Sequence, residues 1–94
     1  MLSNMTKATI IEWASTEDRE AETVEEEDFR FARIDKIFDM MKKGQTDGGH
    51  EYINDTTAKR LWKDESSAQE FIDFVTALSS VHNKTIVSAT IVDI

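Results

Sequence analysis

The stretch that decides the fold is residues 66–94, SSAQEFIDFVTALSSVHNKTIVSATIVDI, in which a helix pattern is followed at once by a strand pattern. Residues 66–83 repeat apolar side chains at the three- and four-residue spacing of one helix face. Ser66 or Ser67 can cap this helix, because Ser67 and Glu70 have the spacing of a capping box, and Asn83 can end it in a left-handed conformation. The spacing predicts an inward stripe of Ala68, Phe71, Ile72, Val75, Leu78 and His82, with Phe74, Ala77 and Val81 beside it.

The strand predicted over residues 85–94 is apolar on both of its faces. Ile86, Val92 and Ile94 alternate onto one face, and Val87, Ala89 and Ile91 onto the other. Residues 7–14, KATIIEWA, predict a second strand of this kind, with Ile10 on one face and Ile11 and Trp13 on the other. Strands that are apolar on both faces are usually covered on both faces.

A helix and a hairpin are predicted between these two strands. Residues 29–43 have helical spacing and end at Gly44, a common stop. Residues 50–63 predict a hairpin, with strands over 51–53 and 58–62 and turn chemistry between them. Two registers are open, because a two-residue loop would place Tyr52 opposite Lys59 and a three-residue loop would place it opposite Arg60. The helix face consists of Phe31, Ile34, Ile37, Phe38 and Met41.

This order of elements predicts an α+β fold with the ferredoxin-like β-α-β-β-α-β arrangement, in a single domain over residues 1–94. We expect a four-stranded antiparallel sheet with two helices on one face. The first strand should pair with the third and the fourth with the second, which makes the first and third strands central. The core should contain Phe71, Ile72, Val75 and Leu78, packed with Ile34, Phe38 and Met41.

The composition excludes several classes of protein. The chain has 94 residues, a net charge of −8, and neither cysteine nor proline. A disulfide scaffold, a cysteine zinc site and a thiol nucleophile are therefore excluded, and a nucleic-acid partner, which needs a basic face, is not expected. We expect a cytoplasmic protein without membrane contact, because no apolar run approaches the roughly 20 residues of a membrane helix and no signal-peptide pattern opens the chain.

An acidic run begins at Glu17 and ends at Asp28, with eight acidic residues and one basic residue. Self-repulsion predicts that about residues 15–28 form an exposed, mobile segment, although acidic side chains also suit the first turn of the following helix. The run can serve as a solubilising loop or dock a basic protein partner. Weak binding of divalent cations and mimicry of nucleic-acid charge are the other interpretations.

The candidate site residues are His50, Tyr52, Arg60 and Trp62. With a three-residue loop they share one face of the hairpin with Asn54 and form a polar and aromatic pocket suited to a small ligand. Tyr52 or His50 could then move a proton, and Arg60 could hold an anion. The alternative is a sheet face packed against a partner, with Arg60 paired to a carboxylate. His82, the other histidine, is expected to pack or cap, and neither a metal nor a cofactor site is predicted.

Residues 60–71, RLWKDESSAQEF, resemble the strand-to-helix junction of the dimeric ferredoxin-like α/β-barrel superfamily, which includes small antibiotic-biosynthesis-type monooxygenases. In that superfamily a tryptophan, here Trp62, closes the third strand, and serine, acidic, alanine and phenylalanine positions open the second helix. The chain is also similar to small uncharacterised proteins of marine viruses and metagenomes. The resemblance implies a homodimeric barrel but no particular reaction, because this fold carries many unrelated functions.

These features predict a small homodimeric interaction or accessory protein, viral in origin and without identifiable catalysis. A second copy would cover the sheet face that two helices leave bare, through Ile11, Trp13 and one face of the strand over residues 85–94. The alternative is a cofactor-independent, monooxygenase-like or isomerase-like dimeric-barrel enzyme acting on a small organic substrate. A cavity at the candidate site would favour the enzyme, and a filled interior would favour the interaction protein.

Overall fold

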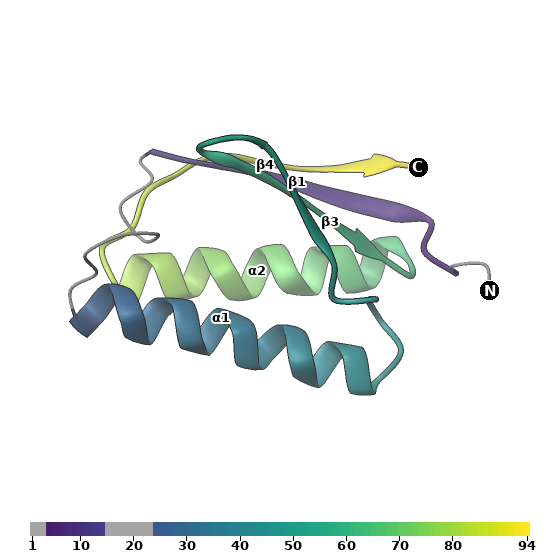
Figure 1. Ribbon diagram of the computed structural model, residues 1–94, viewed down its shortest axis with the longest axis horizontal. Helices are drawn as coiled ribbons and strands as arrows, with labels where there is room; N and C mark the ends of the chain where they lie inside the picture. Colours follow the sequence, from purple (N-terminus) through teal and green to yellow (C-terminus); the bar gives the residue numbers. More distant parts are fainter. Residues whose placement is uncertain (1–3, 15–23) are drawn as a thin grey trace.

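A computed structural model of the chain describes residues 4–14 and 24–94. The elements follow the predicted β-α-β-β-α-β order, and the fold is ferredoxin-like α+β (Figure 1). Four antiparallel strands form one open sheet, and two helices lie side by side against one face of it. The elements are β1 (Lys7–Trp13), α1 (Val24–Lys42), β2 (His50–Asn54), β3 (Thr57–Trp62), α2 (Glu65–Val81) and β4 (Ile86–Asp93).

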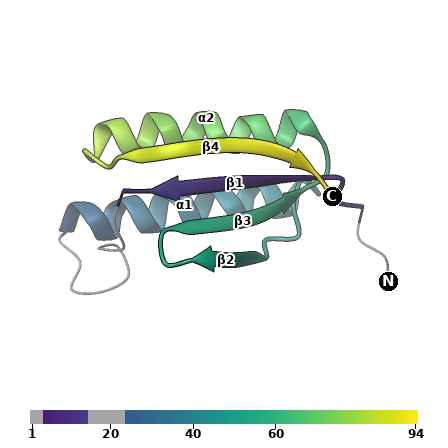
Figure 2. The ribbon, with the colours of Figure 1, turned by 90° about the horizontal axis from the view of Figure 1, so that it is seen from above.

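The strand order in the sheet is β2-β3-β1-β4 (Figure 2). The predicted pairing of β1 with β3, and the central position of both strands, are confirmed. The predicted pairing of β4 with β2 is wrong, because β4 pairs with β1 and β2 pairs with β3. The tight turn between β2 and β3 holds these two strands together, so β2 and β4 occupy opposite edges of the sheet.

The side of the sheet that faces the helices, here called the inner face, carries the core. Residues that pair across antiparallel strands point to the same face. Thr9 pairs with Arg60 and Ile11 pairs with Ala58, so all four lie on the inner face. Ile11 is 4% exposed and Trp13 packs against the same core cluster. The prediction that Ile11 and Trp13 are dimer contacts is therefore wrong, since the helices already cover them.

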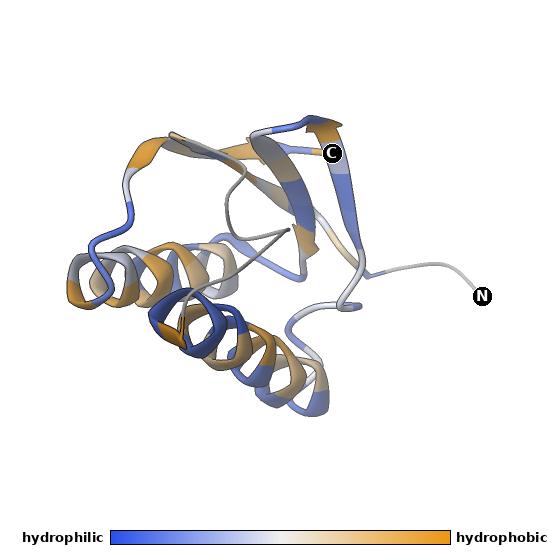
Figure 3. Cartoon of the chain, turned by 60° about the vertical axis from the view of Figure 1, so that its left-hand side comes forward, coloured by the Kyte–Doolittle hydropathy of each residue, from blue (hydrophilic) through white to orange (hydrophobic). Residues whose placement is uncertain are grey.

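The opposite side of the sheet, here called the outer face, is covered by no helix or strand of residues 4–14 and 24–94 (Figure 2). Ala8 is central there and pairs with Leu61 on one side and with Val92 on the other. Ile10 lies on the same face one alternation further along β1. Figure 3 shows both hydrophobic and hydrophilic stretches on the strands that lie above the two helices.

A shift in the register between β1 and β4 changes which face of the sheet some apolar residues of β4 lie on, compared with the predicted alternation. The β1–β4 register shifts between Glu12 and Trp13, so that Trp13 pairs with Ile86. Ile86 therefore packs against the core together with Ala89 and Ile91. The sequence pattern had grouped Ile86 with Val92, because strict alternation takes no account of a bulge.

The hairpin register differs from both predicted alternatives. His50 pairs with Arg60 and Tyr52 pairs with Ala58, and the register shifts before Asn54, which pairs with Thr57. The Oδ1 atom of Asn54 accepts hydrogen bonds from the backbone and the hydroxyl of Thr56, at 2.9 and 3.1 Å. This local bonding tightens the turn and moves the pairing of Tyr52 two residues from the three-residue-loop register. A two-residue shift preserves the face on which each side chain lies.

The centre of the core is the contact between α2 and the middle strands. Trp62 is fully buried, and its ring lies 4.7 Å from that of Phe71, which is 2% exposed. The Trp62 Nε1–H donates a 2.9 Å hydrogen bond to the Thr9 hydroxyl, which is buried on the neighbouring strand. Phe71 and Val75 are buried as predicted. Ile72 and Leu78 are only partly buried.

α1 presents a different face to the core from the one predicted. Its buried residues are Phe29, Ile37 and Met40. Phe38 and Met41, predicted to be buried, are 56% and 39% exposed, and Ile34 is partly buried. Both stripes have helical spacing, and the stripe that includes Phe29 also contains Arg33, which hides it from a hydrophobicity pattern.

Both helices begin earlier than predicted. The N-cap of α2 is Asp64 rather than a serine, because its Oδ1 atom accepts a 2.8 Å hydrogen bond from the Ser67 backbone N–H. α1 begins at Val24, so residues 24–28 of the acidic run form its first turn. Residues 15–23 lie outside the described residues. At the C-terminal end of α2, Asn83 has φ = 57°, as predicted for a left-handed stop.

One residue of the acidic run is tied into the fold. Glu26 Oε2 and Lys84 Nζ lie 2.8 Å apart, with side chains 14% and 8% exposed. The prediction that residues 17–27 are all exposed is therefore wrong at Glu26. The pair joins the first turn of α1 to the segment that leads from α2 into β4.

Candidate functional site

Three of the predicted site residues gather on the inner face of the hairpin. His50 and Tyr52 lie on β2, and Arg60 lies opposite His50 on β3. The rings of His50 and Tyr52 meet edge to face with centroids 5.2 Å apart. β2 is an edge strand, and all five of its residues are exposed. The three side chains are therefore positioned by alternation on one face and can be reached from the open edge of the sheet.

The other two members of the predicted constellation lie elsewhere. Trp62 shares the inner face but is fully buried in the core, where its only polar atom is bonded to Thr9. Asn54 lies beyond the register shift, and its side-chain oxygen is used in the hairpin turn. The structure thus reduces the predicted pocket to a smaller cluster of His50, Tyr52 and Arg60, here called the edge cluster.

Arg60 is the most strongly perturbed member of the edge cluster. Burial, and then the positive charge of Arg33, lower the pKa of Arg60 to about 10, while Tyr52 acts in the opposite direction. The Cζ atom of Arg60 lies 6.0 Å from the centroid of the Phe71 ring. Among the described residues no carboxylate forms an ion pair with Arg60. The alternative in which Arg60 pairs with a carboxylate is therefore not found within residues 4–14 and 24–94.

Arg33 is the residue that the sequence analysis missed. It lies on the inward stripe of α1, one turn after Phe29, and its Cζ atom is 5.3 Å from the Phe29 ring centroid and 5.6 Å from that of Trp13. Positions 29, 33, 37 and 40 have the spacing of one helix face. Because arginine often stacks on aromatic rings, a charged residue at one of these positions can face inward, and allowing for this would have predicted that Arg33 lies on the inward face of the helix.

His50 is shifted towards its neutral form. Although His50 is exposed overall, partial desolvation of its ring is the largest cause of its lowered pKa, followed by the positive charges of Arg60 and Arg33. A neutral imidazole can donate one N–H and accept at its other nitrogen. The edge cluster therefore offers one cationic group, one neutral imidazole and one phenol, which is a set suited to an anion.

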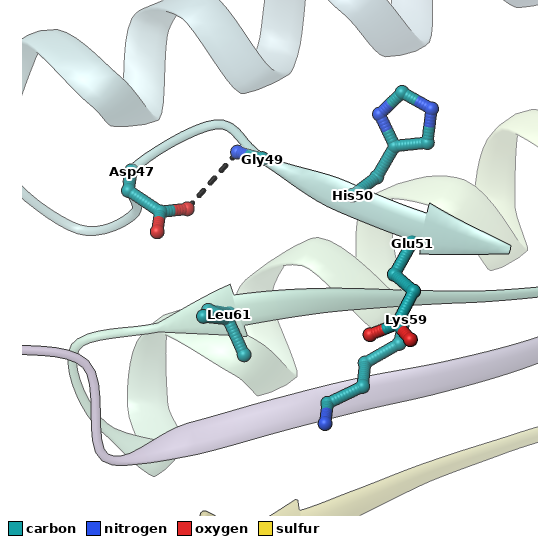
Figure 4. Close-up of a pocket in the computed structure, with 6 residues that line it drawn as sticks. All are labelled: Asp47, Gly49, His50, Glu51, Lys59 and Leu61. Carbon is teal, nitrogen blue, oxygen red and sulfur yellow. Dashed lines mark hydrogen bonds between the residues drawn. The ribbon is translucent and has the colours of Figure 1, made fainter. Parts of the chain in front are cut away.

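A shallow depression of about 270 Å³ lies at the other side of the hairpin (Figure 4). Glu51, Lys59 and Leu61 belong to the outer face, and the loop before β2 closes one end. The Oδ1 atom of Asp47 accepts a 2.9 Å hydrogen bond from the Gly49 N–H, which fixes this loop. The imidazole of His50 points away from Glu51 and Lys59 (Figure 4), but His50 also lines the depression, so the depression and the edge cluster adjoin at this residue.

His82 has a packing role, as predicted. It is the C-cap of α2, and its ring meets the Phe29 ring edge to face at 5.9 Å. No group of three histidine, aspartate or glutamate side chains in the described part of the chain could hold a metal ion.

Comparison of the chain with family models, with curated proteins and with solved structures found no match. Within residues 4–14 and 24–94, neither helix has the length and apolar content that crossing a membrane would require. The fold is compatible with the ferredoxin-like architecture that residues 60–71 resemble.

Proposed function

We propose that the protein is a homodimeric interaction module in which two copies pack their outer sheet faces against each other. The observation that supports this proposal is an apolar patch on the outer face that no described element covers. Its accessible residues are Ile10, Leu61 and Val92, and Ala8 lies between Leu61 and Val92 but is itself fully buried. Leu61, Ala8 and Val92 form one cross-strand row, so the patch is continuous across three strands.

The charged residues around the patch favour a second copy of the same chain as the occupant. Lys59 lies beside Ile10 on the outer face, and Glu12 lies two residues further along β1. Glu51 is opposite Lys59 on β2. A face with one cationic and two anionic groups can pair with itself across a twofold axis, because Lys59 of each copy meets a carboxylate of the other.

The area of the outer sheet face limits the area that this interface can bury. Seven residues of strand extend about 23 Å, and four strands span about 19 Å, so each copy offers an area of about 440 Å² before side-chain relief is counted. The total of about 900 Å² is at the low end for specific interfaces. We therefore expect a reversible dimer that dissociates in the micromolar range rather than an obligate one.

Sedimentation velocity over about 1–200 µM, a range that brackets the expected dissociation constant, tests the proposal. The wild type should change from a 10.7 kDa species to one of twice that mass. Leu61→Glu should remain monomeric throughout while keeping the wild-type circular dichroism, because a carboxylate within the patch cannot be desolvated without cost.

Phe38→Glu is the matched control, because Phe38 is 56% exposed on α1, away from the sheet. It should dimerise like the wild type. A wild type that stays monomeric over the whole range would overturn the proposal. So would a dimer that Phe38→Glu abolishes and Leu61→Glu leaves intact, since the interface would then be α1.

The edge cluster supports binding of a ligand more directly than it supports catalysis. The proton-moving role expected for Tyr52 or His50 stays a prediction. No specific observation favours the catalytic alternative, whereas the burial of Arg60 and the nearby charge of Arg33 favour binding of an anion.

A further inference from the structure

We propose that Arg60 binds the carboxylate of a small organic acid at the open edge between α1 and β2, with His50 and Tyr52 beside the bound group. This proposal does not depend on the dimer, because the edge cluster lies on the inner face and the patch lies on the outer face.

The first argument is the contrast between Arg60 and the four lysines that form ion pairs within the described residues. Lys7, Lys36, Lys43 and Lys84 each pair with a carboxylate, and three of these pairs are exposed or partly exposed at the surface. Arg60 is withdrawn from solvent next to Phe71 and has no such partner among the described residues. A partly buried cation without a counter-ion is unfavourable, so an anion that reaches it gains more than it would at an exposed lysine.

The second argument is the sign of the surrounding charge. Arg33 on α1 repels Arg60 on β3 strongly enough to help lower the pKa of Arg60 and of His50. Arg60 therefore lies within the electrostatic reach of a second cation on the helix that faces it. An anion placed between α1 and the hairpin would relieve this repulsion, and the same contacts would raise the pKa of His50.

The third argument is geometric. No Cα atom of α1 lies within 8 Å of a Cα atom in any described strand, so long side chains rather than close backbone packing occupy this layer. Both Tyr52, which is 48% exposed, and His50 lie at its open edge. The side of β2 is therefore the one from which we expect a ligand to approach Arg60.

The chemistry of the cluster selects a carboxylate with a flat apolar body. The planar guanidinium of arginine can donate two parallel hydrogen bonds to a carboxylate. The neutral His50 N–H can donate to the same group, and the rings of His50 and Tyr52 offer an apolar surface to the rest of the molecule. Inorganic phosphate shares the oxyanion chemistry but lacks the apolar body.

Heteronuclear NMR titration at constant ionic strength, with benzoate, acetate and phosphate as probes, tests the proposal. Benzoate should produce saturable shifts at the amides of residues 50, 52 and 60, and the His50 ring should titrate at higher pH when benzoate is bound. Acetate should bind at the same residues more weakly, because it has no ring to contact Tyr52. Arg60→Gln should weaken benzoate binding by about tenfold or more, since it removes a charge-assisted pair of hydrogen bonds.

Lys59→Gln is the matched control, because it removes one positive charge from the same strand on the opposite face. It should leave the benzoate affinity within about twofold. Arg60→Lys keeps the positive charge but loses the planar guanidinium that donates two parallel hydrogen bonds, so this variant should bind benzoate with intermediate affinity. Leu61→Glu should retain benzoate binding even where the dimer is lost, which separates failure of this proposal from failure of the dimer.

Three results would overturn the carboxylate site. The first is the absence of saturable shifts up to about 50 mM benzoate, a concentration well above any specific weak affinity. The second is phosphate binding with no benzoate binding, which would identify an inorganic oxyanion site. The third is an equal loss of affinity in Lys59→Gln and Arg60→Gln, which would mean that only general charge attraction is measured.

Discussion

Phe71→Ala should lower the free energy of unfolding by about 3–5 kcal/mol, the usual cost of truncating a buried phenylalanine. Phe71 is 2% exposed and lies against Trp62. A buried phenylalanine removes about 150–250 Å² from water, which corresponds to about 4–6 kcal/mol at about 25 cal/mol per Å². Alanine keeps only the part near Cβ, and the large ring of Trp62 cannot easily move into the space that is left.

Urea unfolding followed by circular dichroism at one fixed protein concentration measures this loss, since a dimer would make stability depend on concentration. With a slope of about 2 kcal/mol per molar, the midpoint should fall by about 2 M. If Phe71→Ala does not fold, Phe71→Leu keeps most of the apolar volume and should cost about 1–2 kcal/mol.

Phe38→Ala is the matched control, because Phe38 is also on a helix but is 56% exposed. It should change the free energy of unfolding by no more than about 0.5 kcal/mol. A loss below about 1 kcal/mol for Phe71→Ala, or equal losses for the two variants, would mean that the assignment of buried and exposed helix faces is incorrect.

Thr9→Val should lower the free energy of unfolding by about 1–3 kcal/mol, because it leaves the Trp62 Nε1–H buried without an acceptor. Adding Trp62→Phe to Thr9→Val should cost less than the sum of the two single changes, and additive losses in urea unfolding would show that the hydrogen bond is unimportant. Asp64→Ala should destabilise the protein at neutral pH, because the hydrogen bond from Ser67 lowers the pKa of Asp64 below its ordinary value of 3.8. Because the pKa of Asp64 is lower in the folded state, its ionised carboxylate stabilises the protein above pH 3.8, and this stabilisation is lost as the pH falls below that value. The difference in the free energy of unfolding between wild type and Asp64→Ala should therefore shrink in acid. A difference that stays constant across pH would contradict this.

The catalytic and interaction hypotheses for this protein meet at the hairpin, and the structure separates their residues. The inner side of the hairpin holds the edge cluster, and the outer side contributes Leu61 and Lys59 to the proposed interface. Because successive strand residues alternate between faces, a ligand site and an interface can share β3 without competing for the same side chains.

The sequence by itself determined the order of the elements and most of α2. Helical spacing, alternation and the Asn83 stop depend on residues within about four positions of each other, and such local signals are visible without a structure. They identified Phe71 and Val75 as core residues correctly. The same local signals left two apolar stripes on α1 and could not say which one faces the sheet.

Only the tertiary structure decided which of these stripes is buried, how the hairpin is registered, and which charges meet. Phe29, Ile37 and Met40 are buried because Trp13 and the sheet lie on that side, and the contact of Trp13 with Phe29 joins distant parts of the chain. The hairpin register depended on the bonding of Asn54 within the turn. Arg33 and Arg60 belong to different elements, and only the packing of α1 against the sheet brings the charge of Arg33 close enough to lower the pKa of Arg60.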